Sequence, residues 1–146
     1  LRRWQQVEAN EVRYKGYYLE EARFVVVGFG SAGRVALSAV RAARAEGIPV
    51  GLLRPITLNP FPVKALDELT RQVDGMLVVE MNSGQMLEDV RRVVGDRVPV
   101  EFYGRLGGII PMPDEVLEEI RRLTREPLPL DGHPRDRWLA RMPHSN

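Results

Sequence analysis

Short apolar runs alternate with longer amphipathic stretches four times along the middle of the chain. The runs show no regular polar alternation, which is typical of strands buried on both faces. The stretches between them repeat apolar positions with the period of a helix. We predict strands at 24–29, 50–53, 76–81 and 98–103, and helices at 32–46, 62–73, 84–94 and 113–124.

Strands that are separated by helices in this way indicate a mainly parallel sheet with helices on both faces. The expected fold class is therefore α/β: a three-layer, doubly wound, mainly parallel sheet of about five strands. We expect this domain at 21–125. Residues 1–20 would be a linker with a short helix, and residues 126–146, rich in proline and charge, an extended or disordered tail.

The turn after the first predicted strand contains G-x-G-x-x-G, formed by Gly28, Gly30 and Gly33. Between a strand and a helix, this motif is typical of dinucleotide-binding domains, where a pyrophosphate lies on the helix N-terminus. Such a site also needs an acidic residue at the end of the next strand. This chain has Arg54 and Pro55 there. Only the 2′-phosphate of NADP would suit Arg54.

A structural interpretation of the motif is simpler. The glycines would let the strand turn sharply into the helix, and Ser31 would cap that helix. The free N–H groups of the helix start could still hold an anion. The residues alone therefore leave four functions open: a domain without a cofactor, an NADP-binding domain of a reductase, a small-anion regulatory module, and a dimerising module without a ligand.

The amino-acid composition excludes or disfavours several kinds of binding site. The 146 residues include 21 basic and 20 acidic ones, so no strong field would attract nucleic acid or an anionic membrane. Cysteine is absent, which excludes a disulfide, a thiolate nucleophile and cysteine ligands for an iron–sulfur cluster in this chain. His133 and His144 have no neighbouring ligand cluster, so we expect no metal site.

The chain shows no signal-peptide pattern, and no apolar run approaches the roughly 20 residues that span a bilayer. We therefore expect a cytoplasmic protein without a membrane partner. The first residue is Leu1 rather than Met, which favours a piece of a longer polypeptide.

Three stretches together resemble the transketolase C-terminal domain of many thiamine-diphosphate enzymes: LLRPITLNPFP, LVVEMNSGQMLEDV and PVEFYGRLGGIIPMPDEVLEEI. They resemble in particular the α subunit of 2-oxoacid:ferredoxin oxidoreductases, and most of all its 2-oxoisovalerate and 2-oxoglutarate types. The resemblance covers about residues 10–124. Two positions depart from it: Asn59, where many relatives carry Trp, and GFGS at 28–31, where relatives often have AYGS.

The resemblance implies a complex that decarboxylates a 2-oxoacid oxidatively to an acyl-CoA, with thiamine diphosphate, Mg²⁺, iron–sulfur clusters and coenzyme A. The implied partners are the remaining α-subunit domains, a thiamine-diphosphate-binding β subunit and a ferredoxin-like subunit; a homodimer is an alternative. The family's GDG motif is matched only by Gly95-Asp96-Arg97, without the paired Asn that should follow. We therefore predict a noncatalytic assembly domain with no catalytic residue and no cofactor of its own.

Loops beyond the carboxyl ends of parallel strands form the usable surface of a doubly wound sheet. Two arginines of these loops could clamp a carboxylate, although an ordinary interdomain ion pair is the simpler interpretation. Glu80 ends a buried strand and is interpreted as a hydrogen-bonded structural carboxylate. The candidates for an interface or an anion site are Ser31, Arg54, Asn59, Phe61, Asn82, Gln85 and Arg105.

Overall fold

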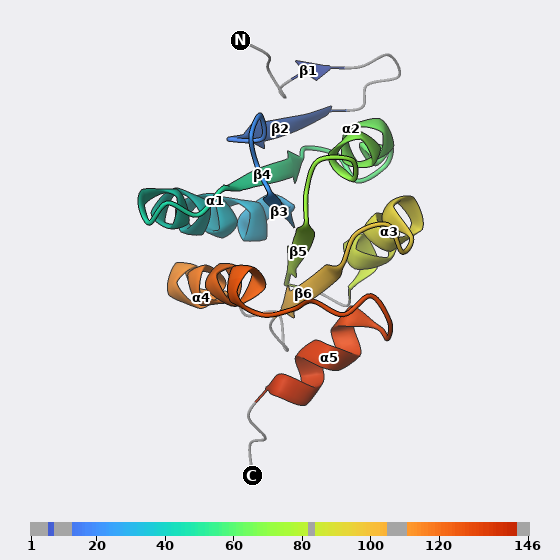
Figure 1. Ribbon diagram of the computed structural model, residues 1–146. Helices are drawn as coiled ribbons and strands as arrows, with labels where there is room; N and C mark the ends of the chain where they lie inside the picture. Colours follow the sequence, from blue (N-terminus) through green and yellow to red (C-terminus); the bar gives the residue numbers. More distant parts are fainter. Residues whose placement is uncertain (1–5, 8–12, 82–83, 105–110, 143–146) are drawn as a thin grey trace.

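The computed structural model describes residues 6–7, 13–81, 84–104 and 111–142. A twisted sheet lies between two layers of helices (Figure 1). The strands are β1 (Gln6–Val7), β2 (Arg13–Tyr17), β3 (Phe24–Gly28), β4 (Val50–Pro55), β5 (Gly75–Glu80) and β6 (Val100–Gly104). The helices are α1 (Gly30–Ala45), α2 (Val63–Leu69), α3 (Gln85–Val94), α4 (Pro113–Arg125) and α5 (Pro134–Arg141).

The strand order in the sheet is β1-β2-β4-β3-β5-β6. Strands β3 to β6 run parallel, whereas β2 pairs antiparallel with β4 and β1 pairs antiparallel with β2. From β3 the chain first adds β4 on one side and then crosses back to add β5 on the other. The prediction of a doubly wound, mainly parallel α/β sheet is confirmed, and β3 and β5 flank its topological switch point.

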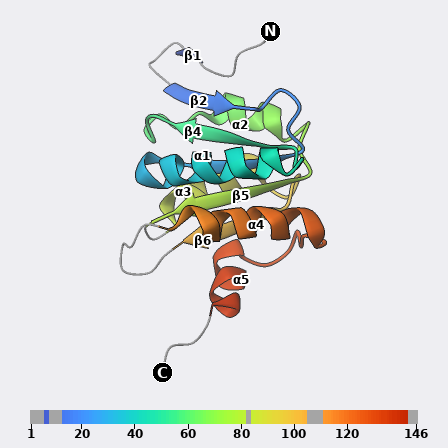
Figure 2. The ribbon, with the colours of Figure 1, turned by 90° about the vertical axis from the view of Figure 1, so that its left-hand side faces the viewer.

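Helices cover both faces of the sheet. Figures 1 and 2 show α1 beside α4 on one face, with α2 and α3 on the other. Side chains of β3 enter the two cores alternately: Val25 and Val27 face α2 and α3, and Val26 faces α1 and α4. All three are fully buried. Burial on both faces explains the continuous apolar run, because a strand directs successive side chains to opposite sides.

The N-terminal segment differs from the predicted linker with a short helix. Residues 13–17 form β2, which pairs with the outer edge of β4. Tyr14 is buried in the core beside α2 and α3, whereas Arg13 and Lys15 are exposed. This alternation is the signal of a strand with one covered face. The five residues of β2 are too few for it to stand out from its polar surroundings.

The C-terminal segment differs from the predicted extended or disordered tail. Pro134 occupies the first turn of α5, and the His133 side chain accepts a hydrogen bond from the Arg135 N–H at 3.1 Å. Proline is well suited to a first helical turn, where no intrahelical partner is needed for its nitrogen. Trp138 is buried beside β6. Proline therefore marks the beginning of a helix here, rather than its absence.

Candidate functional site

A cavity lies at the switch point between β3 and β5, at the edge of the sheet where the parallel strands end. Open α/β sheets bind ligands and partners at this position. Its volume is about 270 Å³. The surrounding residues come from the ends of β3 and β5, the loop after β4 and the first turns of α1 and α3. They are Phe29, Gly30, Ser31, Leu58, Val79, Glu80, Met81, Gln85 and Met86.

The glycine motif brings the end of β3 and the start of α1 into close contact. A Cβ atom on Gly33 would lie 2.7 Å from the carbonyl oxygen of Gly28, and one on Gly28 would lie 3.0 Å from the Gly33 Cα. Gly30 has a positive φ of 62°, and a Cβ there would meet nothing within 4 Å. Two of the glycines thus permit close packing, and the third permits the turn.

The expectation that Ser31 caps α1 is wrong. The N-cap residue is Phe29, which has no side-chain cap, and Ser31 lies exposed inside the first turn. The reason is the turn at Gly30, which starts the helix earlier than the hydrophobic pattern suggests. The first turn contains no acidic residue. The positive end of the α1 dipole therefore faces the cavity without a neutralising side chain from its own first turn.

Glu80 neutralises the start of α3. Its two carboxylate oxygens accept hydrogen bonds from the backbone N–H groups of Met86 (3.1 Å) and Leu87 (2.8 Å). The residue is only 8% exposed. Burial raises the pKa of the Glu80 carboxyl, and the two N–H donors oppose that rise. This geometry agrees with a structural carboxylate that joins β5 to α3, as the sequence indicated.

Replacing Glu80 with Gln is expected to change the pH dependence of stability. Because the pKa of Glu80 is raised in the folded state, the folded protein binds this proton more tightly than the unfolded chain. The stability that the proton contributes is present below the ordinary glutamate pKa of about 4.3 and is lost as pH rises through the raised pKa.

The Glu80→Gln variant lacks this titration. Its stability relative to the wild type should therefore increase as pH rises above about 4.3. Urea unfolding of both proteins between pH 4 and 8 measures the difference, in which the other carboxylates cancel. A difference that stays constant, or that falls with rising pH, would contradict the assignment.

Arg54 occupies the position where a dinucleotide site would have its acidic residue. It is half-buried at the end of β4. Its Cγ and Nε atoms lie about 3.0 Å from the position that a Gly33 Cβ would take, so the side chain runs along the start of α1. Within the described ranges, no ion pair joins Arg54 to another residue. The Arg54 guanidinium thus places a positive charge near the N-terminus of α1, beside the glycine motif.

The other candidates divide into three groups. Ser31 and Gln85 line the cavity from opposite helices. Asn59 is exposed before the cis peptide bond to Pro60, and Phe61 is half-buried against the core beside α2 and α3; neither lines the cavity. The remaining two candidates, Asn82 and Arg105, lie outside the described residues.

Sequence reasoning missed the apolar lining of the cavity. Phe29, Leu58 and Met81 follow the ends of β3, β4 and β5 and surround the opening with hydrocarbon. The available signal was their position: Phe29 and Met81 are the last residues of two predicted strands, and Leu58 lies in the loop after a third, at the edge where these loops meet. The candidates in these loops are polar except for Phe61, which does not line the cavity. The cavity is consequently more apolar than the candidate set suggested.

Metal binding has no support in the part of the chain that the structure describes. No group of three or more His, Cys, Asp or Glu residues there could hold a metal ion. His133 instead lies with Nε2 2.7 Å from a carboxylate oxygen of Glu88 on α3. Among the same residues, no helix has the length and apolar character needed to cross a membrane.

Comparison with known proteins identifies the family. Residues 22–116 match the family described as pyruvate:ferredoxin oxidoreductase core domain II. The chain is 49% identical over 122 residues to the ketoisovalerate oxidoreductase subunit VorB of Methanothermobacter thermautotrophicus, covering 84% of this chain and 34% of that protein. It is 37% identical over 103 residues to the 2-oxoglutarate synthase subunit KorA of Methanothermobacter marburgensis, covering 70% and 28%.

Solved structures share the fold. A 2-oxoglutarate:ferredoxin oxidoreductase from Magnetococcus marinus superimposes with a TM-score of 0.70 at 23% identity, over 77% of this chain and 20% of that one. A split-gene transketolase gives a TM-score of 0.62 at 20% identity, over 75% and 42%. The chain thus spans about a third of the length of the curated relatives cited above, and the match to the family covers well over half of the chain. This chain belongs to the family of pyruvate:ferredoxin oxidoreductase core domain II, as its resemblance to 2-oxoacid:ferredoxin oxidoreductases predicted.

Proposed function

We propose that the chain is a noncatalytic assembly domain of the α subunit of a 2-oxoacid:ferredoxin oxidoreductase. The whole complex would decarboxylate a 2-oxoacid oxidatively and form an acyl-CoA in the cytoplasm. Its partners would be the remaining α-subunit domains, a thiamine-diphosphate-binding β subunit and a ferredoxin-like subunit. The similarity to ketoisovalerate and 2-oxoglutarate oxidoreductase subunits supports this assignment.

The observation that carries the proposal is the apolar character of the edge at which the parallel strands end. Phe29 and Ile56 follow β3 and β4 and are 39% and 41% exposed, and Met112 before α4 is 58% exposed. Leu58 and Met81 line the cavity at the same edge. Large apolar side chains that gather at one edge favour a contact with another protein surface. We infer that this edge packs against the catalytic part of the enzyme.

The chemistry of the residues supports a noncatalytic role. In the complex, thiamine diphosphate with Mg²⁺ would stabilise the reacting carbon, iron–sulfur clusters would carry electrons, and coenzyme A would accept the acyl group. This chain has no cysteine to hold a cluster. The carboxylate that lines the cavity, Glu80, already accepts two backbone N–H groups. The residues of this chain therefore do not fit the cofactors named above. We assign these cofactors to other parts of the complex.

Binding of a dinucleotide agrees less well with the same geometry. The cavity of about 270 Å³ is small even for a drug-sized ligand, which typically needs about 300–1,000 Å³. The ribose-binding acid is replaced by Arg54, whose side chain lies against the start of α1. Gly28 and Gly33 already have a packing role. The apolar edge therefore favours a protein partner over NADP.

The proposal is tested by placing a charge on the apolar edge of the complete enzyme. Phe29→Asp and Ile56→Asp are each expected to weaken assembly at least about tenfold, because a buried charge at an interface is costly and 1.4 kcal/mol corresponds to tenfold. Native mass spectrometry of the purified complex measures the assembled fraction.

Leu130→Asp is the matched control, because Leu130 is 60% exposed in the connection between α4 and α5, away from this edge. It should leave the assembled fraction unchanged. Full assembly of both Phe29→Asp and Ile56→Asp would overturn the proposed role.

A further inference from the structure

Helix α5 wraps around the free edge of the sheet at β6. Figure 1 shows it beside β6, running from the side of α3 towards the side of α4. Glu101 and Phe102 are successive residues of β6, so their side chains point to opposite faces of the sheet. Helix α5 contacts both: Arg137 donates to Glu101, and the Trp138 ring packs against Phe102. One short helix thus touches both faces of the sheet.

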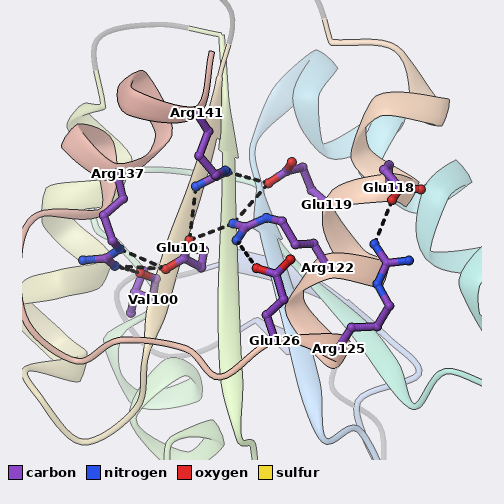
Figure 3. Close-up of polar contacts among 9 residues, drawn as sticks. All are labelled: Val100, Glu101, Glu118, Glu119, Arg122, Arg125, Glu126, Arg137 and Arg141. Carbon is purple, nitrogen blue, oxygen red and sulfur yellow. Dashed lines mark hydrogen bonds and ion pairs between the residues drawn. The ribbon is translucent and has the colours of Figure 1, made fainter. Parts of the chain in front are cut away.

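Glu101 is the polar centre of this contact. It is 2% exposed, and three arginines donate to its carboxylate: Arg122 from α4 at 2.8 Å, and Arg137 and Arg141 from α5 at 3.1 and 3.4 Å (Figure 3). Glu119 of α4 pairs with Arg141 at 2.8 Å and extends the network. A buried carboxylate is stable only when it is paired. Two of the three partners of Glu101 are on α5, so the docked helix is what keeps this charge satisfied.

Arg137 also satisfies the edge of β6. Its guanidinium donates to the carbonyl oxygen of Val100 at 2.8 Å and to that of Asp131 at 2.6 Å, besides Glu101. The edge strand of a sheet presents backbone groups that no neighbouring strand pairs. Arg137 takes the place of such a neighbour at Val100. Its planar group with several donors is suited to this task, and a lysine ammonium is not.

Helix α5 and the α4 arginine that it meets at Glu101 also hold unsatisfied polar atoms. Three buried side-chain nitrogens in the described residues have no hydrogen-bond partner: Nε of Arg122, Nε of Arg135 and Nε1 of Trp138. Two belong to α5, and the third belongs to the α4 arginine that shares Glu101 with it. A buried N–H without an acceptor loses its hydration without compensation. Segments with such costs open at lower free energy than the core.

We propose that residues 127–142, here called the clasp, detach from β6 and dock on it again as a unit. The ion pairs of Glu101 with Arg137 and Arg141 hold the clasp in the docked position. The α/β body stays folded when the clasp opens, and the outer edge of β6 becomes accessible. The clasp lies outside residues 22–116, which match the family. This inference does not depend on the proposed assembly role. It concerns the outer edge of β6, whereas Phe29 and Ile56 follow β3 and β4, which lie on the inner side of β6 in the sheet.

Hydrogen exchange of the full chain, followed by mass spectrometry, tests the clasp. Glu101→Gln is expected to raise the exchange rates of 127–142 and of β6 at least tenfold, while β3 and β5 keep theirs. Glu118→Gln is the matched control: Glu118 is an exposed carboxylate of α4 that pairs with Arg125 and Arg121, away from α5 (Figure 3). It should change neither segment.

Arg137→Lys supplies a second test if Glu101→Gln fails to fold. It keeps the charge but cannot donate to Glu101, Val100 and Asp131 together, and it should release the same segment. Unchanged exchange of 127–142 in the folded variants would overturn the role of Glu101. An equal rise in β3 and β5 would overturn the clasp, because α5 would then open only together with the core.

Discussion

Replacing Phe102 with Ala is expected to lower the free energy of unfolding by about 3–5 kcal/mol. The Phe102 ring is fully buried in the core beside α2 and α3. It also meets Trp138 edge to face, with 5.1 Å between the ring centroids. The substitution removes buried apolar surface, leaves a cavity and deletes an aromatic pair worth about 0.5–1.5 kcal/mol beyond its area. Helix α5 loses the ring contact between Trp138 and Phe102 of β6.

Urea unfolding followed by circular dichroism measures this loss from the shift of the midpoint at an unchanged slope. Phe102→Leu is the control, because it keeps most of the buried volume and should cost well under half as much. A loss below about 1.5 kcal/mol for Phe102→Ala would show that the ring packs less closely than the structure indicates.

The α/β body could be predicted because its sequence pattern and its burial have the same cause. Strands β3 and β5 are covered on both faces, so side chains such as Val26 and Val27 had to be apolar at successive positions. Helix α4 begins at Pro113 and carries Asp114 and Glu115 in its first turn, which is a strong local start signal. Where the local pattern and the tertiary environment agree, the sequence is sufficient.

Strand β2 and helix α5 could not be predicted, because their stability comes from distant residues. Tyr14 becomes a strand residue through its pairing with β4. Trp138 becomes a helix residue through the ring of Phe102, 36 positions earlier in the chain. Neither segment is long enough to show a periodic pattern of its own. Short elements of this kind depend on packing rather than on propensity.

The polar network on β6 did have a signal in the sequence. Glu101 interrupts an apolar run that is otherwise buried, and a buried charge requires a partner. What the sequence could not supply was the identity of those partners. Arg122, Arg137 and Arg141 are 21, 36 and 40 residues away, among 19 arginines of which most could serve.

The cavity at the carboxyl edge shows the converse difficulty. Its position followed from the topology, because the ends of β3 and β5 meet at a switch point. Its lining did not, since apolar residues such as Phe29 and Met81 resemble ordinary core residues in a sequence. Only their exposure and their place around an opening distinguish them.

Substitutions can separate the two roles of the glycine motif, because Gly33 serves close packing and Gly30 serves the turn. Gly33→Ala places a Cβ 2.7 Å from the Gly28 carbonyl oxygen, a backbone atom that cannot move without displacing β3. Overpacking typically costs about 1–3 kcal/mol and occasionally more, and a Cβ placed 2.7 Å from a backbone atom belongs above the top of that range, at about 3–4 kcal/mol. The gain of about 1 kcal/mol for alanine over glycine in a helix offsets part of it. We expect a net loss of about 2–3 kcal/mol.

Gly30→Ala is the matched variant, because its Cβ would enter open space and only the positive φ of 62° is unfavourable. It should cost about 1–2 kcal/mol, the price of a left-handed backbone for a residue with a Cβ. Urea unfolding of the two variants in parallel gives the comparison. If Gly33→Ala were as stable as the wild type, the close contact of β3 with α1 would not explain the motif, and a ligand would again be needed to account for Gly33. A larger loss in Gly33→Ala than in Gly30→Ala is the result expected of a motif that serves packing.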